Sequence, residues 1–201
     1  MWIFSLSKKI TKIKKIAVKK ILLTGSSGFI GSSILNRLSK QYVIYCITRN
    51  KKKIKLSNNI FEVNYKNYKE LNTKLKKLKV DVVIHCATHY VKKHNFEDIQ
   101  KLAESNLIFG NIILENLQFL SPKKFINFSS VWENYNSIED NHFNLYSVYK
   151  KNFRNIMLFY KKKYSNIKFY NLFISDTFGE SDTRMKIINL LRLNYKKNKQ
   201  T

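Results

Sequence analysis

The sequence predicts an α/β fold, a doubly wound parallel sheet with helices on both faces. Short apolar runs alternate with longer amphipathic stretches, as they do where a helix connects each strand to the next. Two of the runs, Ile21–Thr24 and Asp81–Ala87, are apolar on both faces, which suits strands covered by helices on each side. Three of the five glycines, Gly25, Gly28 and Gly31, directly follow the first run.

The predicted elements follow one another in the order that right-handed crossover connections require. Strands are predicted at Lys20–Thr24, Tyr42–Thr48, Ile60–Val63, Val80–Cys86, Lys124–Phe128 and Lys168–Phe173. The longer stretches between them predict helices at Ile30–Ser39, Tyr68–Leu78, Phe96–Leu120 and Tyr146–Lys163.

The composition is that of one packed domain with part of another. The 201 residues are 44% hydrophobic and 14% aromatic, which is enough for a sizeable core. No apolar run approaches the ~18 residues that span a bilayer. Cys46 and Cys86 lie inside apolar runs, which predicts reduced core thiols and a cytoplasmic protein. The four histidines and two cysteines show no metal-ligand spacing.

The net charge of +25 and the pI near 10.0 raise the question of nucleic-acid binding. Lysine is spread through the chain beside abundant Asn and Ile, and arginine, the usual base-reading residue, is scarce. A genome-wide compositional bias explains the charge better, so no specific nucleic-acid partner is predicted. The basic extension at residues 1–18 is either a solvated segment or an amphipathic helix for an acidic surface.

The glycine spacing has a physical reason in a strand–turn–helix unit. Gly25 permits a sharp turn, Gly28 lets the backbone approach a pyrophosphate, and Gly31 lets helix and strand pack closely. The following helix offers N–H groups and its positive dipole end to the phosphates. Because glycine inside a helix costs about 1 kcal/mol relative to alanine, Gly31 needs a packing or ligand reason. An ordinary glycine-rich turn is the alternative interpretation.

The motif T-G-x-x-G-F-I-G, ending at Gly31, resembles that of the extended short-chain dehydrogenase/reductase superfamily, the NAD-dependent epimerase/dehydratase family. Asp81–Ala87 is similar to the family's D-V-V-I-H-x-A strand, and Asn106–Glu115 to its N-x-x-x-G-x-x-x-L-E helix. The resemblance implies a Rossmann-type NAD(P)-binding domain at residues 19–174. Residues 175–201 then begin a substrate-binding region shorter than the family's. We therefore expect a truncated chain, a fragment, or a protein completed by a partner such as a second copy in a homodimer.

The resemblance also implies the cofactor contacts. Arg49 ends the second predicted strand, where an acidic residue would hold a ribose 2′-hydroxyl, and this favours NADP over NAD. Asn64 occupies the usual acidic position near the adenine and can accept a hydrogen bond. The predicted cofactor-binding residues are Gly25, Ser27, Gly28, Phe29, Ile30, Gly31, Arg49, Asn64, Ala87, Asn106 and Lys150.

The family's catalytic signature is a Tyr-x-x-x-Lys pair with a hydroxyl upstream. Tyrosine and lysine four residues apart share a helix face, where the lysine charge is expected to lower the pKa of the tyrosine. The pair occurs four times in this lysine-rich chain, and the pair Tyr146/Lys150 opens a helix after a strand that ends in hydroxyls. We predict Tyr146 as acid/base, Lys150 as its partner and Ser130 as the hydroxyl that orients the substrate oxygen, with Ser129 as the alternative. The competing interpretation is that Tyr146 and Lys150 are ordinary surface residues of a helix.

The reaction is suggested by the residues around that hydroxyl. Dehydratases of the family place an acidic pair directly after it, where this chain has Val131 and Trp132, with Glu133 one position late. Residues 175–184, with Asp182 and Arg184 as substrate-side candidates, resemble the corresponding region of CDP-abequose and CDP-paratose synthase-like reductases. The resemblance implies a 4-keto reductase or 4-epimerase acting on a nucleotide sugar for surface-polysaccharide synthesis. The alternatives are a catalytically incomplete dinucleotide-binding module and a basic binder of nucleic acid or membrane surfaces.

Overall fold

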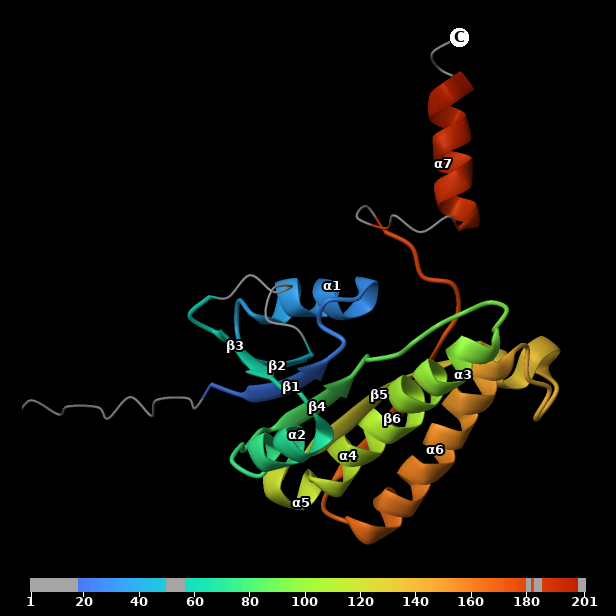
Figure 1. The fold of residues 1–201 in the computed structure, drawn as a ribbon. Helices are drawn as coiled ribbons and strands as arrows, with labels where there is room; N and C mark the ends of the chain where they lie inside the picture. The colour runs from blue at the N-terminus through green and yellow to red at the C-terminus, as the bar shows by residue number, and fades with distance from the viewer. Residues whose placement is uncertain (1–17, 50–56, 180–181, 183–185, 199–201) are drawn as a thin grey trace, which may run out of the picture.

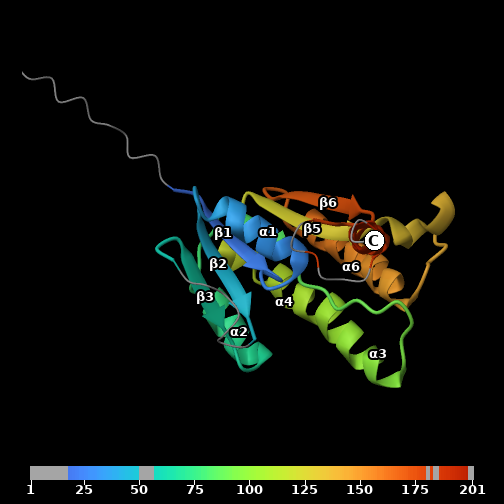
Figure 2. The same ribbon diagram turned by 90° about the horizontal axis from the view of Figure 1, so that it is seen from above.

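A computed structural model describes residues 18–49, 57–179, 182 and 186–198 and confirms the doubly wound parallel sheet (Figure 1). In these residues the strand order is β3-β2-β1-β4-β5-β6, seen from above in Figure 2, and every pair of neighbours is parallel. The basic extension lies outside the described residues except for Val18. The strands are β1 (Lys20–Thr24), β2 (Val43–Thr48), β3 (Ile60–Asn64), β4 (Val82–His85), β5 (Lys124–Ser130) and β6 (Lys168–Ile174).

The helices agree with prediction except in one long stretch. The predicted helix Phe96–Leu120 is divided into α3, a π-helical turn η1, α4 and a short α5. Asn116 separates α4 from α5, and its side-chain amide donates to the Ile112 carbonyl and to Asn72 of α2. The helical segments are α1 (Phe29–Leu38), α2 (Tyr68–Leu75), α3 (Phe96–Ala103), η1 (Glu104–Ile108), α4 (Phe109–Glu115), α5 (Leu117–Leu120), the 3-10 segment η2 (Val131–Ser137), α6 (Leu145–Lys163) and α7 (Ile187–Asn198).

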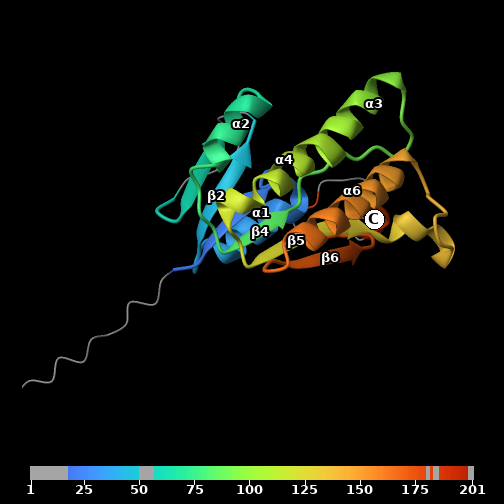
Figure 3. The ribbon, with the colours of Figure 1, turned by 90° about the horizontal axis from the view of Figure 1, so that it is seen from below.

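Two separate cores cover the two faces of the sheet. Helices α2, α4 and α6 cover one face of the sheet (Figure 3). Leu22, Val83 and Phe125 of the strands form the larger core together with buried side chains of these helices. The intervening residues of β1, such as Leu23, point to the opposite face and pack with Leu35 of α1. This alternation explains why the strand sequences are apolar on both faces.

The crevice for a ligand follows from the strand order. The chain runs from β1 outward to β3, then returns to β4 beside β1 and runs outward to β6. The carboxyl ends of β1 and β4 therefore meet where the order reverses, which is the place where open α/β sheets bind ligands. In the described part of the chain, no helix has the length and apolarity needed to cross a membrane.

Candidate active site

The turn after β1 is built on two glycines that accept no side chain. Gly25 has φ +70, and a Cβ there would lie 2.6 Å from the Ala87 nitrogen. A Cβ on Gly31 would overlap the Gly25 carbonyl oxygen, so this glycine lets α1 pack against the turn itself. That differs in detail from the helix-to-strand packing predicted for Gly31. Gly28 is less restricted, because its Cβ would lie 3.3 Å from the Gly25 oxygen.

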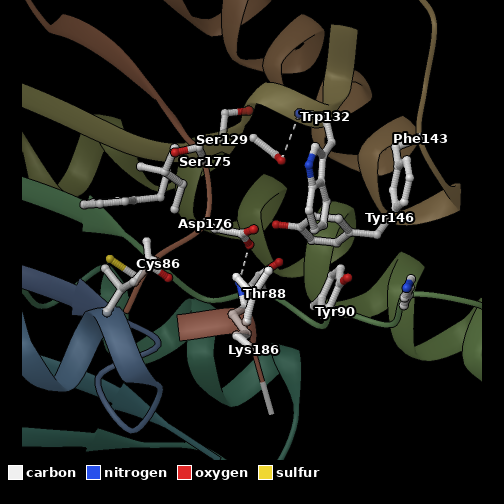
Figure 4. A pocket seen from close by; sticks show the side chains of 17 residues that line it. Cys86, Thr88, Tyr90, Ser129, Trp132, Phe143, Tyr146, Ser175, Asp176 and Lys186 are labelled. Carbon is white, nitrogen blue, oxygen red and sulfur yellow. Dashed lines mark hydrogen bonds and ion pairs between the residues drawn. The ribbon is translucent and has the colours of Figure 1, made fainter. Parts of the chain in front are cut away.

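Two adjoining cavities open at this edge of the sheet and share Ile30, Cys86 and Thr88. The smaller, of about 330 Å³, contains most of the predicted cofactor residues; it is lined by Gly25, Ser27, Gly28, Phe29, Ile30, Ile47, Thr48, Arg49, Tyr65, Cys86, Ala87, Thr88, Ser105 and Phe109. The larger, of about 670 Å³, is shown in Figure 4 and is lined by Ile30, Cys86, Thr88, Tyr90, Lys92, Phe128, Ser129, Ser130, Trp132, Phe143, Tyr146, Ile174, Ser175, Asp176, Thr177, Lys186 and Ile187.

The smaller cavity fits a dinucleotide phosphate. Gly28 is the N-cap of α1, so the first N–H groups of this ten-residue helix face a cavity whose wall lacks a side chain at that position. The Arg49 guanidinium lies on the same wall, at the end of β2. The chemistry of this donor set, backbone N–H groups with one cation, suits a phosphate-bearing group.

Four predicted cofactor residues, Gly31, Asn64, Asn106 and Lys150, do not line either cavity. Gly31 packs against the turn, as described above. Asn64 donates its amide to the Thr48 backbone oxygen at 3.4 Å and to the Thr48 hydroxyl at 3.3 Å. Asn106 is buried in the π-helical turn. Its oxygen accepts hydrogen bonds from the Thr88 hydroxyl at 2.6 Å and the His89 N–H at 3.1 Å, and its amide donates to the His89 carbonyl at 2.9 Å. Asn106 therefore fixes the loop after β4 that both cavities share.

Tyr146, at the start of α6, reaches into the larger cavity beside Trp132 and Tyr90 (Figure 4). Its ring meets the Tyr90 ring edge-on at 5.0 Å, and its hydroxyl hydrogen-bonds the Thr88 side chain. Burial raises the pKa of Tyr146 above its ordinary value. The expected lowering by lysine is not found, because Lys150 is not among the groups that shift the pKa of Tyr146.

Lys150 lies one turn further along α6, with 3% of its surface exposed. Burial lowers its pKa to about 8, and the nearby charge of Glu133 opposes this shift. The imidazole of His85 packs among the rings of Phe109, Phe125 and Phe153, and burial together with the Lys150 charge lowers its pKa to about 3. Lys150 is therefore a buried amine that titrates close to neutral pH.

The two hydroxyls that end β5 differ in their partners. Ser130 accepts a hydrogen bond from the Trp132 N–H at 3.2 Å, a bond that leaves its own proton for another acceptor. Ser129 instead donates to the buried carboxylate of Glu133. Both line the larger cavity, so the structure brings Ser129, Ser130 and Tyr146 together there, whereas Lys150 is buried and is not among the lining residues.

Sequence reasoning missed several residues of this cavity. Thr88 follows β4 at the carboxyl edge of the sheet, and that position alone could have indicated it. Trp132 packs against Tyr90 and Phe143, with ring centroids 5.7 and 5.1 Å away, and forms an aromatic wall beside Tyr146. An ion pair of 2.6 Å joins the lining residues Asp176 and Lys186. Asp182 does not line the cavity, and Arg184 lies outside the described residues.

The topology of the sheet, the glycine turn after β1 and the cavity beside that turn are the features of a Rossmann-type α/β protein. Residues 21–201 match the model of the NAD dependent epimerase/dehydratase family, and the chain belongs to this family.

Similar proteins come from several organisms. The chain is 33% identical over 150 residues to a dTDP-D-glucose 4,6-dehydratase of Dictyostelium discoideum, covering 65% of this chain and 33% of that protein. It is 32% identical over 174 residues to a CDP-abequose synthase of Yersinia pseudotuberculosis, covering 86% and 60%. The fold is similar to that of the Bordetella bronchiseptica enzyme WbmG in complex with NAD, with a TM-score of 0.76 at 15% identity, covering 92% and 62%. The chain thus spans less than two thirds of the length of each.

Proposed function

We propose that this chain binds NADP(H) and acts at C4 of a nucleotide sugar, as a 4-keto reductase or a 4-epimerase. The observation that carries the proposal is the pair of joined cavities: one presents the glycine turn and Arg49, the other Tyr146 and Ser130. We further propose that the reaction takes place in the cytoplasm and supplies surface-polysaccharide synthesis. The free thiols of Cys46 and Cys86 support a reducing compartment.

The proposed roles follow from the chemistry of each group. NADP(H), when bound, supplies or accepts a hydride at its nicotinamide ring. The Tyr146 hydroxyl gives a proton to the sugar oxygen when the carbonyl is reduced, and takes one when the alcohol is oxidised. Ser130 donates a hydrogen bond to the same oxygen and stabilises the charge that develops on it. Lys150, when protonated, holds ribose hydroxyls of the cofactor and favours the tyrosinate formed after proton transfer.

The residues directly after Ser130 favour reduction over dehydration. Val131 and Trp132 stand where a dehydratase would have acidic groups, and Glu133 is fully buried rather than directed into the cavity. Residues 131–133 therefore bring no acidic side chain to the substrate.

The proposed activity is tested by incubating the chain with NADPH and 4-keto nucleotide sugars and following cofactor absorbance. A reductase consumes one NADPH for each sugar reduced, whereas an epimerase interconverts two sugars with no net change in cofactor. Cofactor binding without either outcome, across CDP-, UDP- and dTDP-linked sugars, would instead indicate a dinucleotide-binding module.

Arg49 is expected to set the choice of cofactor. It is exposed on the wall of the smaller cavity, where its guanidinium can pair with a 2′-phosphate. The wild-type chain should bind NADPH at least about tenfold more tightly than NADH, and Arg49→Asp should reverse the order because a carboxylate repels the phosphate and accepts from a 2′-hydroxyl. Cofactor fluorescence titration measures both affinities. Arg192→Asp, an equal charge change on exposed α7, is the control; a preference that Arg49→Asp leaves intact would assign the choice elsewhere.

We also propose that two copies associate through α4 and α6. A groove of about 600 Å³ between these helices is lined largely by apolar side chains, including Ile112 and Ile156. Phe159 is one of its lining residues and has 63% of its surface exposed. A two-fold axis would let Phe159 of each copy enter the groove of the other, which is the self-complementarity that a symmetric dimer needs. Phe159→Glu should therefore give monomers in sedimentation velocity, whereas Phe96→Glu on α3 should not; a wild-type monomer would overturn the proposal.

A further inference from the structure

We propose that Glu133 is a positioning residue of this site: its buried carboxylate, held by Arg154, keeps Lys150 protonated and holds Ser129 away from the substrate, leaving Ser130 as the hydroxyl that acts. This inference rests on the proposed function for the roles of Lys150 and Ser130. The arrangement itself is a property of the chain alone.

Glu133 is a charged residue in a place where charge is costly. It lies in η2, directly after β5, and its side chain is fully buried. One carboxylate oxygen accepts from the Ser129 hydroxyl, and the other accepts from Arg154 Nε at 2.9 Å. Both oxygens thus accept hydrogen bonds, which is the pattern of an ionised carboxylate. A buried charge of this kind persists only when it is paired and hydrogen-bonded, so its partners must stay in place.

The contact with Ser129 separates the roles of the two hydroxyls. The Ser129 proton is committed to Glu133, so this hydroxyl cannot also donate to a substrate oxygen. Ser130 accepts from the Trp132 N–H and retains its proton. Glu133 therefore decides between the two candidates that the sequence left open.

The charge of Glu133 also acts on Lys150 from the facing element. The titratable groups that interact with the Lys150 amine are His85 and Cys86 at the end of β4 and Glu133 from η2. Tyr146 and Arg154 lie one turn away on either side of Lys150 on α6. Burial lowers the pKa of His85 to about 3 and raises that of Cys86 to about 12, so both are neutral at pH 7. Tyr146 is neutral too, since its pKa is raised. Among these groups, Glu133 supplies the negative charge that opposes the desolvation of Lys150.

Arg154 shares the same carboxylate, and its positive charge has the sign that lowers the pKa of a neighbouring amine. It lies one turn beyond Lys150 on α6, and its guanidinium stands over the Phe173 ring of β6 at 5.6 Å. Removing Glu133's charge leaves Lys150 beside an unpaired guanidinium, which lowers the pKa of Lys150 further. Removing Arg154 leaves the Glu133 carboxylate with Lys150 as its nearby cation, which raises the pKa of Lys150. We therefore expect the two substitutions to shift the pKa of Lys150 in opposite directions.

The test is an NMR titration of the Lys150 side chain in protein labelled with ¹³Cε-lysine, with the signal assigned by its loss in Lys150→Arg. The wild-type midpoint is expected near pH 8. Glu133→Gln should lower it by about one pH unit or more, a tenfold fall in the protonated-to-neutral ratio, and Arg154→Met should raise it. Glu139→Gln removes an equal charge at an exposed position after η2 and should leave the midpoint unchanged.

The opposite signs distinguish electrostatic positioning from loosened packing. The proposal would be overturned if the Lys150 midpoint moved in the same direction in Glu133→Gln and in Arg154→Met. It would also be overturned if the midpoint did not move in a folded Glu133→Gln chain. If Glu133→Gln does not fold, Arg154→Met decides alone, and an unchanged or lowered midpoint refutes the role. The titration uses no cofactor or substrate, so failure of the proposed activity would leave this result standing.

Discussion

Replacing Gly31 with alanine is expected to unfold the chain, whereas the same change at Gly28 should leave it folded but weaken NADP(H) binding. The Gly31 Cβ would overlap the Gly25 carbonyl oxygen, and it would lie 3.0 Å from the Ser26 Cα. Both neighbours are backbone, so no side chain can swing aside. The gain of about 1 kcal/mol in helix propensity does not offset an overlap that costs about 3 kcal/mol or more.

Gly28 is the matched control within the same turn. It has an extended backbone with φ −83, which any residue adopts, and its Cβ would lie 3.3 Å from the Gly25 oxygen. The free energy of unfolding should therefore change by less than about 1 kcal/mol. The added methyl group would occupy the cavity wall that a phosphate approaches, so the Kd for NADPH should rise at least about tenfold.

Urea unfolding and cofactor fluorescence measure the two effects separately. A Gly31→Ala chain as stable as wild type would mean that the turn can move away from α1. A folded Gly28→Ala chain that binds NADPH as well as wild type would mean that the phosphates lie elsewhere, and with them the proposed cofactor site.

The strands were predictable from sequence because each is a short apolar run, and the central strands β1 and β4 are buried on both faces. β1 begins and ends where its apolar run does, and β2, β3 and β6 differ from prediction by one residue. β4 is shorter, since Val80 and Asp81 leave the ladder: the Val80 N–H donates to the Leu120 carbonyl, and the Asp81 carboxylate accepts from the Lys20 N–H at 2.8 Å. Such contacts join distant residues and leave no local pattern.

The division of the helix at 96–120 has the same origin. Its apolar periodicity continues through the π-helical turn, so the sequence gives no sign of a break. The buried Asn106 in that turn bonds to Thr88 and His89, which precede it by 18 and 17 residues. A Cβ on Gly110, one turn later, would clash with the Phe153 ring of α6. Tertiary contacts with the β4 loop and α6 therefore accompany the break.

The residues of the candidate site that belong to sequence motifs were predictable. Those that are brought in by tertiary burial were not. The glycine turn and the Tyr146/Lys150 pair follow from spacing and position in the chain. The full burial of the Glu133 side chain could not be predicted, because charged residues are rarely fully buried without a partner. Its partner Arg154 is 21 residues away and meets it only in the fold.

Tyr146→Phe should reduce turnover by about 10²–10⁴-fold while leaving cofactor affinity unchanged. The hydroxyl is the group proposed to carry the proton, and its loss leaves the ring, its contact with Tyr90 and the cavity shape in place. The smaller cavity, which holds the proposed phosphate site, does not include Tyr146. Rates of NADPH oxidation with a 4-keto nucleotide sugar, beside a fluorescence titration of NADPH, measure the two quantities.

Tyr149→Phe provides the matched control, since it removes the same hydroxyl from the same helix three residues further on, outside both cavities. It should retain the wild-type rate. Because burial lowers the pKa of Lys150 to about 8 and raises that of Tyr146, the wild-type rate of reduction should fall as the pH rises, first when Lys150 loses its proton and then when the hydroxyl ionises. A Tyr146→Phe chain that keeps both the wild-type rate and that alkaline fall would assign the proton to another group. If both Tyr146→Phe and Tyr149→Phe lose the wild-type rate, the loss would reflect a structural role of helix α6 and not the chemistry of one hydroxyl.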